Sequence, residues 1–180
     1  MAGYERHELE RKGWPTAAEI RDRFPEAMHR EFLRRAIASA RRAGIEERTG
    51  FPFGALIVDR GGRVASDAPN RVAADFDPTA HAEVRAIRLA CASLKAIRLE
   101  GCLLYASSEP CPMCLSAAYW ASVDGVVFAA GADDSAAING FDDAFLYRQV
   151  AEPAASRRLP TFNLMRDEAL AVLKEYDARG

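Results

Sequence analysis

Two short motifs carry the side chains best suited to chemistry. Cys111 and Cys114 lie three residues apart in the run Pro-Cys-Pro-Met-Cys that begins at Pro110. At that spacing two thiolates share one face of a helical turn and can bind one ion. The second motif, His81-Ala-Glu83, adds an imidazole nitrogen and a carboxylate. Together these residues predict a metal centre with an acid–base group beside it.

The ligand set predicts a catalytic zinc site. His81, Cys111 and Cys114 supply three protein ligands, which leaves the fourth tetrahedral position for water or hydroxide. We therefore expect one Zn²⁺ per subunit. Zinc lowers the pKa of bound water from about 15.7 to about 7, which supplies a nucleophile at neutral pH. Glu83 is the expected proton carrier, because positions i and i+2 of a helix diverge and its carboxylate can face the pocket without binding the metal.

Other interpretations of the cysteine pair are a thioredoxin-like redox motif and a structural zinc site. A redox motif would not need the His-Ala-Glu run, and a structural site would need a fourth ligand, for which neither Cys91 nor Cys102 has the spacing. We expect those two cysteines to be buried packing residues. H-x-E followed by P-C-x-x-C is the signature of zinc nucleobase deaminases, so hydrolytic deamination is the predicted chemistry. A zinc-binding module without activity is the remaining alternative.

The hydrophobic pattern around the motifs alternates helices with strands. We expect an amphipathic helix from Glu26 to Ala43 with Gly44 as its C-cap, and a hairpin over 53–66. Further helices are expected to begin at the two motifs, one of them capped by Asp77 or Thr79. The remaining expected elements are strands at 102–106, 125–130 and 159–164 and helices at 131–140 and 166–176. This alternation indicates an α/β fold.

Length and charge limit the organisation and the partners. The 180 residues predict a single domain over 27–180, preceded by a charged N-terminal extension over 1–26. A net charge of -2 is no footprint for binding nucleic acid. No apolar run approaches the roughly 18 residues of a membrane span, and the N-terminus lacks a signal-peptide core. We expect a cytoplasmic protein with neither a membrane nor a nucleic-acid partner.

Five segments carry a more specific pattern, namely Pro52–Ala55, Asp77–Val84, Ser108–Cys114, Tyr119–Ala121 and Gly140–Asp143. Through them the chain resembles the cytidine deaminase superfamily and, within it, the small bacterial guanine deaminases, from about Phe32 to Pro160. The first three segments recur in several branches of this superfamily, including the tRNA adenosine deaminases. Phe-Asp-Asp at 141–143 is the segment that distinguishes the guanine deaminase branch from the others. The resemblance implies a three-layer α/β/α fold with a central mixed five-stranded sheet flanked by helices.

The resemblance also implies roles for individual residues. Asp143 is implied to contact a purine and assist proton transfer, with Asp142 beside it. The other residues implied to line or clamp the pocket are Phe53, Asn70, Ala82, Trp120 and Phe141. From the residues alone, Asn70 also fits an ordinary turn, Trp120 a core aromatic, and the acidic pair a helix cap. A buried carboxylate suits guanine, whose ring N–H and amine are donors.

The implied reaction is deamination of free guanine to xanthine and ammonia. The alternatives are a guanosine, cytosine, cytidine or aminotriazine deaminase, while a tRNA adenosine deaminase is disfavoured by the sequence pI of about 6.0. The implied assembly is a homodimer, in which the segment 156–180 is a candidate for exchange. The chain departs from the guanine branch at its end, because Tyr176 does not match the terminal tyrosine that caps the pocket there.

Overall fold

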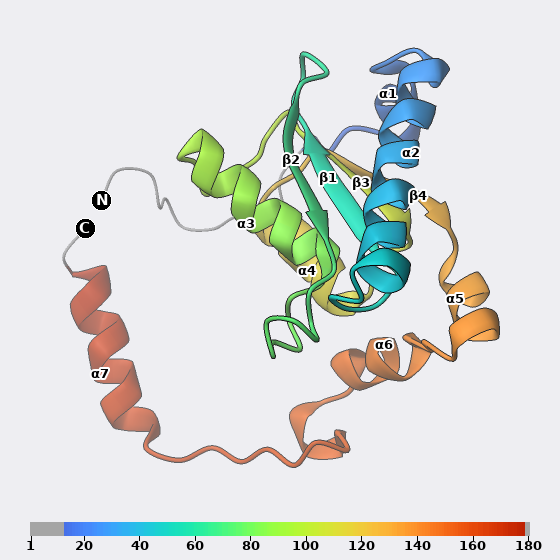
Figure 1. Cartoon of the computed structure of the whole chain (residues 1–180). Coiled ribbons are helices and arrows are strands. Elements are labelled where there is room, and N and C mark those ends of the chain that lie inside the picture. Colours follow the sequence, from blue (N-terminus) through green and yellow to red (C-terminus); the bar gives the residue numbers. More distant parts are fainter. Residues whose placement is uncertain (1–12, 179–180) are drawn as a thin grey trace. The chain divides into compact units, whose positions relative to one another are not determined.

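The computed structural model describes residues 13–178, and its main feature is a four-stranded sheet in the order β2-β1-β3-β4 (Figure 1). Its strands are β1 (Gly54–Val58), β2 (Val64–Pro69), β3 (Leu103–Ser108) and β4 (Gly125–Ala130). β1 pairs antiparallel with both β2 and β3, whereas β3 pairs parallel with β4. The predicted mixed sheet is therefore confirmed.

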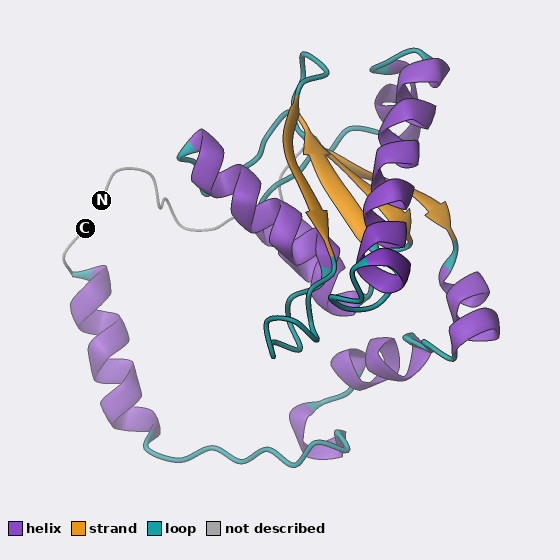
Figure 2. Ribbon diagram, viewed as in Figure 1, coloured by secondary structure: helices purple, strands orange, loops and turns teal. Residues whose placement is uncertain are grey.

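Helices cover both faces of this sheet (Figure 2). One face carries α1 (Ala17–Asp22) and α2 (Glu26–Arg41), and the other carries α3 (Ala82–Leu94) and α4 (Pro112–Trp120). Alternate residues of β1 point to opposite faces, as the period of two requires: Leu56 and Val58 pack with α1 and α2, while Ala55 and Ile57 pack with α3 and α4. The predicted three-layer α/β/α architecture is confirmed.

The expected fifth strand is wrong for the described residues. The chain divides into two compact units, Met1–Asp143 and Ala144–Gly180, and the second holds α6 (Ala144–Ala151), a 3₁₀ turn (Ala154–Ser156) and α7 (Arg166–Asp177). Residues 159–164 are irregular and exposed. A strand needs a neighbouring strand to pair its N–H and C=O groups, and the described part of this unit contains none.

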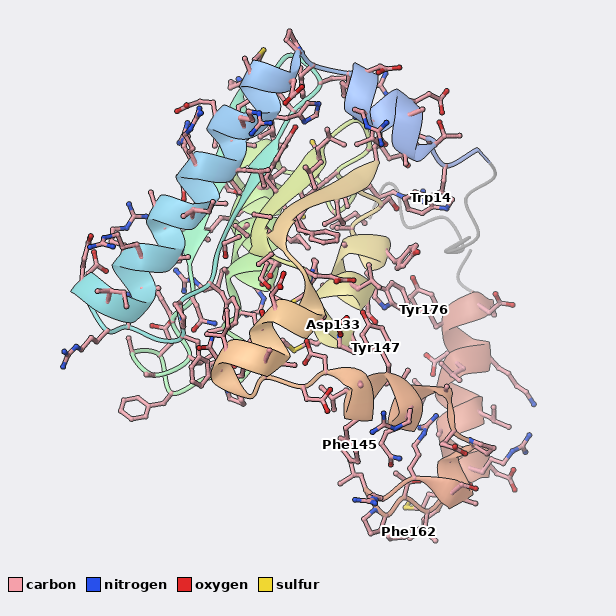
Figure 3. The ribbon with its side chains drawn as sticks, turned by 90° about the vertical axis from the view of Figure 1, so that its right-hand side faces the viewer. Trp14, Asp133, Phe145, Tyr147, Phe162 and Tyr176 are labelled. Carbon is pink, nitrogen blue, oxygen red and sulfur yellow. The ribbon has the colours of Figure 1, made fainter. Side chains whose placement is uncertain are left out.

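Aromatic side chains of the second unit are exposed to solvent. They are drawn in Figure 3, and the four labelled there are Phe145, Tyr147, Phe162 and Tyr176. None of the described residues from 144 to 178 is buried. The two helices of this unit are therefore not stabilised by an apolar core of their own.

The helix α2 does not end at Gly44 as expected but continues through a π-helical turn, Arg42–Glu46. Gly44 has a different role, because a Cβ there would lie 2.6 Å from the side chain of Pro52. The absence of a side chain lets this π-helical turn approach the segment that leads into β1. None of the helices in the described range is both long and apolar enough to cross a membrane.

The segment before α2 packs against α2 and the sheet. Ile20 and Phe24 are buried in the core between α2 and the sheet. Arg23 forms a 2.8 Å ion pair with Asp124, whose carboxylate is 1% exposed. This part of the expected extension therefore contributes to the core. Residues 1–12 lie outside the described residues, and the division into an extension and one domain stays a prediction.

Candidate active site

The two chemical motifs meet where two helices begin. His81 is the N-cap of α3 and Cys111 is the N-cap of α4, each with an extended backbone, and Cys114 lies in the first turn of α4. Neither N-cap side chain makes a capping hydrogen bond to the backbone of its own helix, so both can face a common point. The expected caps of α3, Asp77 and Thr79, are wrong because Asp77 Oδ1 accepts instead from the Thr79 N–H at 2.7 Å.

The three ligand atoms have the spacing that zinc requires. His81 Nδ1 lies 3.7 Å from Cys111 Sγ and 3.5 Å from Cys114 Sγ, and the two sulfurs are 3.5 Å apart. A tetrahedral zinc with Zn–S bonds of about 2.3 Å and a Zn–N bond of about 2.0–2.1 Å separates two sulfurs by about 3.8 Å and nitrogen from sulfur by about 3.6 Å. The group fits one zinc ion.

The two thiols differ in how readily they ionise. The hydrogen bond with Cys114, followed by the neighbouring His81, lowers the pKa of Cys111 to about 4 against the effect of burial. The same hydrogen bond raises the pKa of Cys114, as do burial and the nearby Glu83. Cys114 is fully buried, so a cation is needed to hold it as a thiolate beside a second one.

Glu83 lies directly beside this group. Its side chain is 5% exposed, and the Cys114 thiol donates to its Oε2 at 3.4 Å. Burial raises the pKa of Glu83, since a carboxylate loses hydration there. A carboxyl with a raised pKa is suited to both accepting and releasing a proton near neutral pH.

A cavity of about 110 Å³ opens onto the metal-ligand group. It contains three of the expected substrate-contacting residues, Phe53, Phe141 and Asp143, together with Glu83. Burial, followed by the charge of Cys111, raises the pKa of Asp143. The complete lining is Phe51, Phe53, His81, Glu83, Ser108, Glu109, Cys111, Ala132, Ser135, Phe141 and Asp143. The cavity thus places three carboxyl groups, those of Glu83, Glu109 and Asp143, and an aromatic wall around one point.

Four other expected substrate residues do not line this cavity. Ala82 is buried in the core between α3 and the sheet, Trp120 ends α4 half-exposed, and Asp142 is exposed. Asn70 is fully buried; its Oδ1 accepts from the N–H groups of Phe51 and Val72, while its Nδ2 has no hydrogen-bond partner in the described structure. Their roles in binding stay predictions.

Five lining residues were not predicted, and two pairs of them join β3 to α5 (Ala132–Asn139). Ser108 Oγ lies 2.9 Å from Ser135 Oγ, and Glu109 Oε2 accepts from the Ala132 N–H at 3.0 Å. Ser108 and Glu109 belong to the segment before Cys111, so a local signal for them existed. Ala132 and Ser135 had none, because only the folded chain brings α5 to the cavity. The fifth residue, Phe51, precedes the Pro52–Ala55 segment.

Residues 26–130 match the cytidine and deoxycytidylate deaminase zinc-binding region. The chain therefore belongs to this family, and the matched range contains the group of His81, Cys111 and Cys114. It is a zinc-binding hydrolytic deaminase acting on C–N bonds, as the sequence predicted.

Among individual proteins, the chain is 46% identical over 148 residues to the guanine deaminase of Bacillus subtilis, covering 82% of this chain and 93% of that protein. The X-ray structure of guanine deaminase from Bacillus subtilis superposes with a TM-score of 0.78 at 43% identity, covering 83% of this chain and 94% of the other. The crystal structure of NE0047 in complex with 2,6-diaminopurine gives a TM-score of 0.59 at 33% identity, over 83% and 82% of the two chains.

Proposed function

We propose that this protein hydrolyses free guanine to xanthine and ammonia. The observation that carries the proposal is the cavity in which Asp143 and Glu83 face the zinc-ligand group. Its similarity to the guanine deaminase of Bacillus subtilis, 46% identical and covered over 93% of its length, supports the same substrate. The solved complex of NE0047 with 2,6-diaminopurine supports a small purine as the ligand class.

His81, Cys111 and Cys114 are proposed to hold one zinc ion per chain, with water as the fourth ligand. When bound, zinc would supply a nucleophilic water at neutral pH by lowering its pKa to about 7. The fit of the three ligand atoms to tetrahedral distances supports this assignment.

Glu83 is proposed to move the protons of the reaction. Its buried carboxyl takes a proton from the attacking water and passes it to the ring nitrogen beside the amino-bearing carbon. It then takes the remaining proton of the added hydroxyl and gives it to the amino group, which leaves as ammonia while the carbonyl forms. Asp143 is proposed to accept a hydrogen bond from the ring N–H or amine of the base and to assist that transfer. Its raised pKa and its place in the same cavity support this role.

The remaining contacts are proposed to orient the base. Phe53 and Phe141 stand edge to face with centroids 5.5 Å apart and form an apolar wall for a flat ring. Asn70 does not line the cavity and is assigned through the family resemblance; its buried Nδ2, without a partner in the described structure, is the donor that it offers to a carbonyl oxygen. Ala82, Trp120 and Asp142 are assigned here through the family resemblance alone.

The size of the cavity favours a free base. A volume of about 110 Å³ corresponds to roughly 7 to 11 water-sized spheres at about 10–15 Å³ each. This is close to the number of non-hydrogen atoms in a purine base and well below that in a nucleoside. A ribose would therefore extend beyond the cavity.

The test is ammonia release by the zinc-loaded protein from guanine, guanosine, cytosine, cytidine and adenine. Turnover of guanine ahead of the other four is the expected result. If cytosine is converted while guanine is inert, the role assigned to Asp143 is refuted. If no compound releases ammonia, guanine deamination is refuted as a whole.

We also propose a homodimer, for which the segment 156–180 is the candidate for exchange between subunits. The support is that the unit Ala144–Gly180 has no buried residue in its described part, while Leu159, Phe162 and Leu173 are exposed. Large apolar side chains exposed on a segment without a core of its own fit a surface that another chain covers. Light scattering coupled to size exclusion should give twice the chain mass, and a monomeric mass would contradict the proposal. A cytoplasmic location likewise stays a prediction.

A further inference from the structure

Phe51 stands at the mouth of the cavity. It lines the cavity together with Phe53 and Phe141, yet 44% of the residue is exposed. Phe53 is only partly exposed and packs against the core between the sheet and α3. The Phe51 and Phe141 rings stand edge to face with centroids 4.8 Å apart. Phe51 is therefore the outermost ring of a row of three.

The backbone around Phe51 is held in place. Its N–H donates to Asn70 Oδ1 at 3.2 Å, and its carbonyl accepts from the Phe53 N–H at 2.7 Å across Pro52. The proline ring restricts φ at that position. A Cβ on Gly50 would overlap Asn70 Oδ1, so this segment lies directly against the buried amide. The backbone that carries the Phe51 ring is thus a fixed part of the rim.

The position of the chemistry decides which part of a purine faces this rim. The amino-bearing carbon must reach Glu83, which is 5% exposed and lies at the inner end of the cavity. That carbon belongs to the six-membered ring of guanine. The five-membered ring, which carries the ribose in a nucleoside, therefore points outward. There a ribose would meet the side chain of Phe51.

We propose that Phe51 is a specificity-determining residue that admits the free purine base and excludes its nucleoside. The inference rests on the proposed guanine deamination. Two properties of the side chain act separately. Its bulk closes the mouth against a ribose, and its aromatic face stacks on the base.

The experiment compares Phe51→Ala, which removes bulk and aromaticity, with Phe51→Leu, which keeps most of the bulk. Phe76→Ala is the matched control, because Phe76 is 94% exposed and does not line the cavity. kcat/KM is measured for guanine and guanosine with each zinc-loaded full chain. Binding of both compounds is measured by calorimetry in a Glu83→Gln background. Zinc content and circular dichroism verify the fold of each variant.

The expected results separate bulk from stacking. Phe51→Ala should raise the KM for guanine about 5-fold or more and raise the guanosine-to-guanine ratio of kcat/KM at least about 10-fold. Phe51→Leu should raise the KM for guanine while leaving that ratio close to the wild-type value. Phe76→Ala should change neither quantity. Guanosine should bind in the Glu83→Gln background only when Phe51 is also replaced by alanine.

Three outcomes would overturn the proposal. An unchanged ratio in Phe51→Ala, with guanine still converted by the wild-type protein, refutes the role of Phe51 and leaves the proposed function intact. A ratio raised as strongly by Phe51→Leu as by Phe51→Ala shows that bulk is not the determinant. A wild-type protein that neither binds nor converts any purine refutes the proposed function, and the role of Phe51 with it.

Discussion

Replacement of Glu83 by glutamine tests the proton transfer most directly. The amide has nearly the same shape as the carboxyl, whose Oε2 lies 3.4 Å from Cys114 Sγ, and its NH₂ group can donate to that sulfur as a thiolate. The zinc ligands therefore keep their surroundings. A glutamine cannot exchange a proton, and general acid–base catalysis contributes about 10²- to 10⁴-fold, or about 2.7–5.5 kcal/mol of activation free energy. We expect kcat to fall by this factor.

The same substitution should not destabilise the fold. Burial raises the pKa of Glu83, so the folded protein holds an ionisable group in a place where its charged form is disfavoured. A neutral amide removes that cost. The Tm of Glu83→Gln is therefore expected to equal or exceed that of the wild-type protein, as is common where a catalytic group is replaced.

The assay combines ammonia release from guanine, zinc per chain by atomic spectroscopy, and Tm by calorimetry. The matched control is Glu31→Gln, because Glu31 lies exposed on α2, paired with Arg34. The control should retain wild-type rates. A Glu83→Gln variant that keeps its zinc and its full activity would falsify the proton-transfer role. Loss of zinc in that variant would instead identify Glu83 as a ligand.

Three further predictions concern the metal and the two sides of the sheet. Dialysis against a chelator should abolish ammonia release and Zn²⁺ should restore it, whereas restoration by Mg²⁺ would contradict a thiolate site. Tyr105→Phe removes a hydroxyl that lies 2.7 Å from His29 Nδ1, and we expect the free energy of unfolding to fall by about 1–3 kcal/mol and Tm by about 2–12 °C, with kcat unchanged. An unchanged Tm in calorimetry would contradict this expectation. Glu109→Ala removes the acceptor of the 3.0 Å bond from the Ala132 N–H and should raise the KM for guanine about 2- to 10-fold with zinc retained. Glu109→Gln keeps an acceptor oxygen and should have a KM close to the wild-type value. An equal KM in both variants would refute the role of this hydrogen bond in shaping the cavity.

The sequence by itself determined the zinc-ligand group, the class of reaction and the alternation of strands and helices. These features are encoded locally. Cys111 and Cys114 share a helical turn because of their spacing, and proline suits the start of that turn. The β1 residues reveal two buried faces through their continuous apolar run.

Only the tertiary structure decided which residues surround the centre and how many strands the sheet contains. Ser135 and Ala132 reach the cavity because α5 bonds to the end of β3, and no sequence spacing predicts a contact between residues of separate elements. Likewise, the apolar pattern at 159–164 was compatible with a strand, but a strand requires a partner that its own sequence does not specify. The position of Phe51 at the mouth depends on the burial of Asn70, which the sequence left open between a turn and a binding role. Local spacing therefore determined the reaction, whereas long-range packing decided the shape of the pocket in which a substrate is selected.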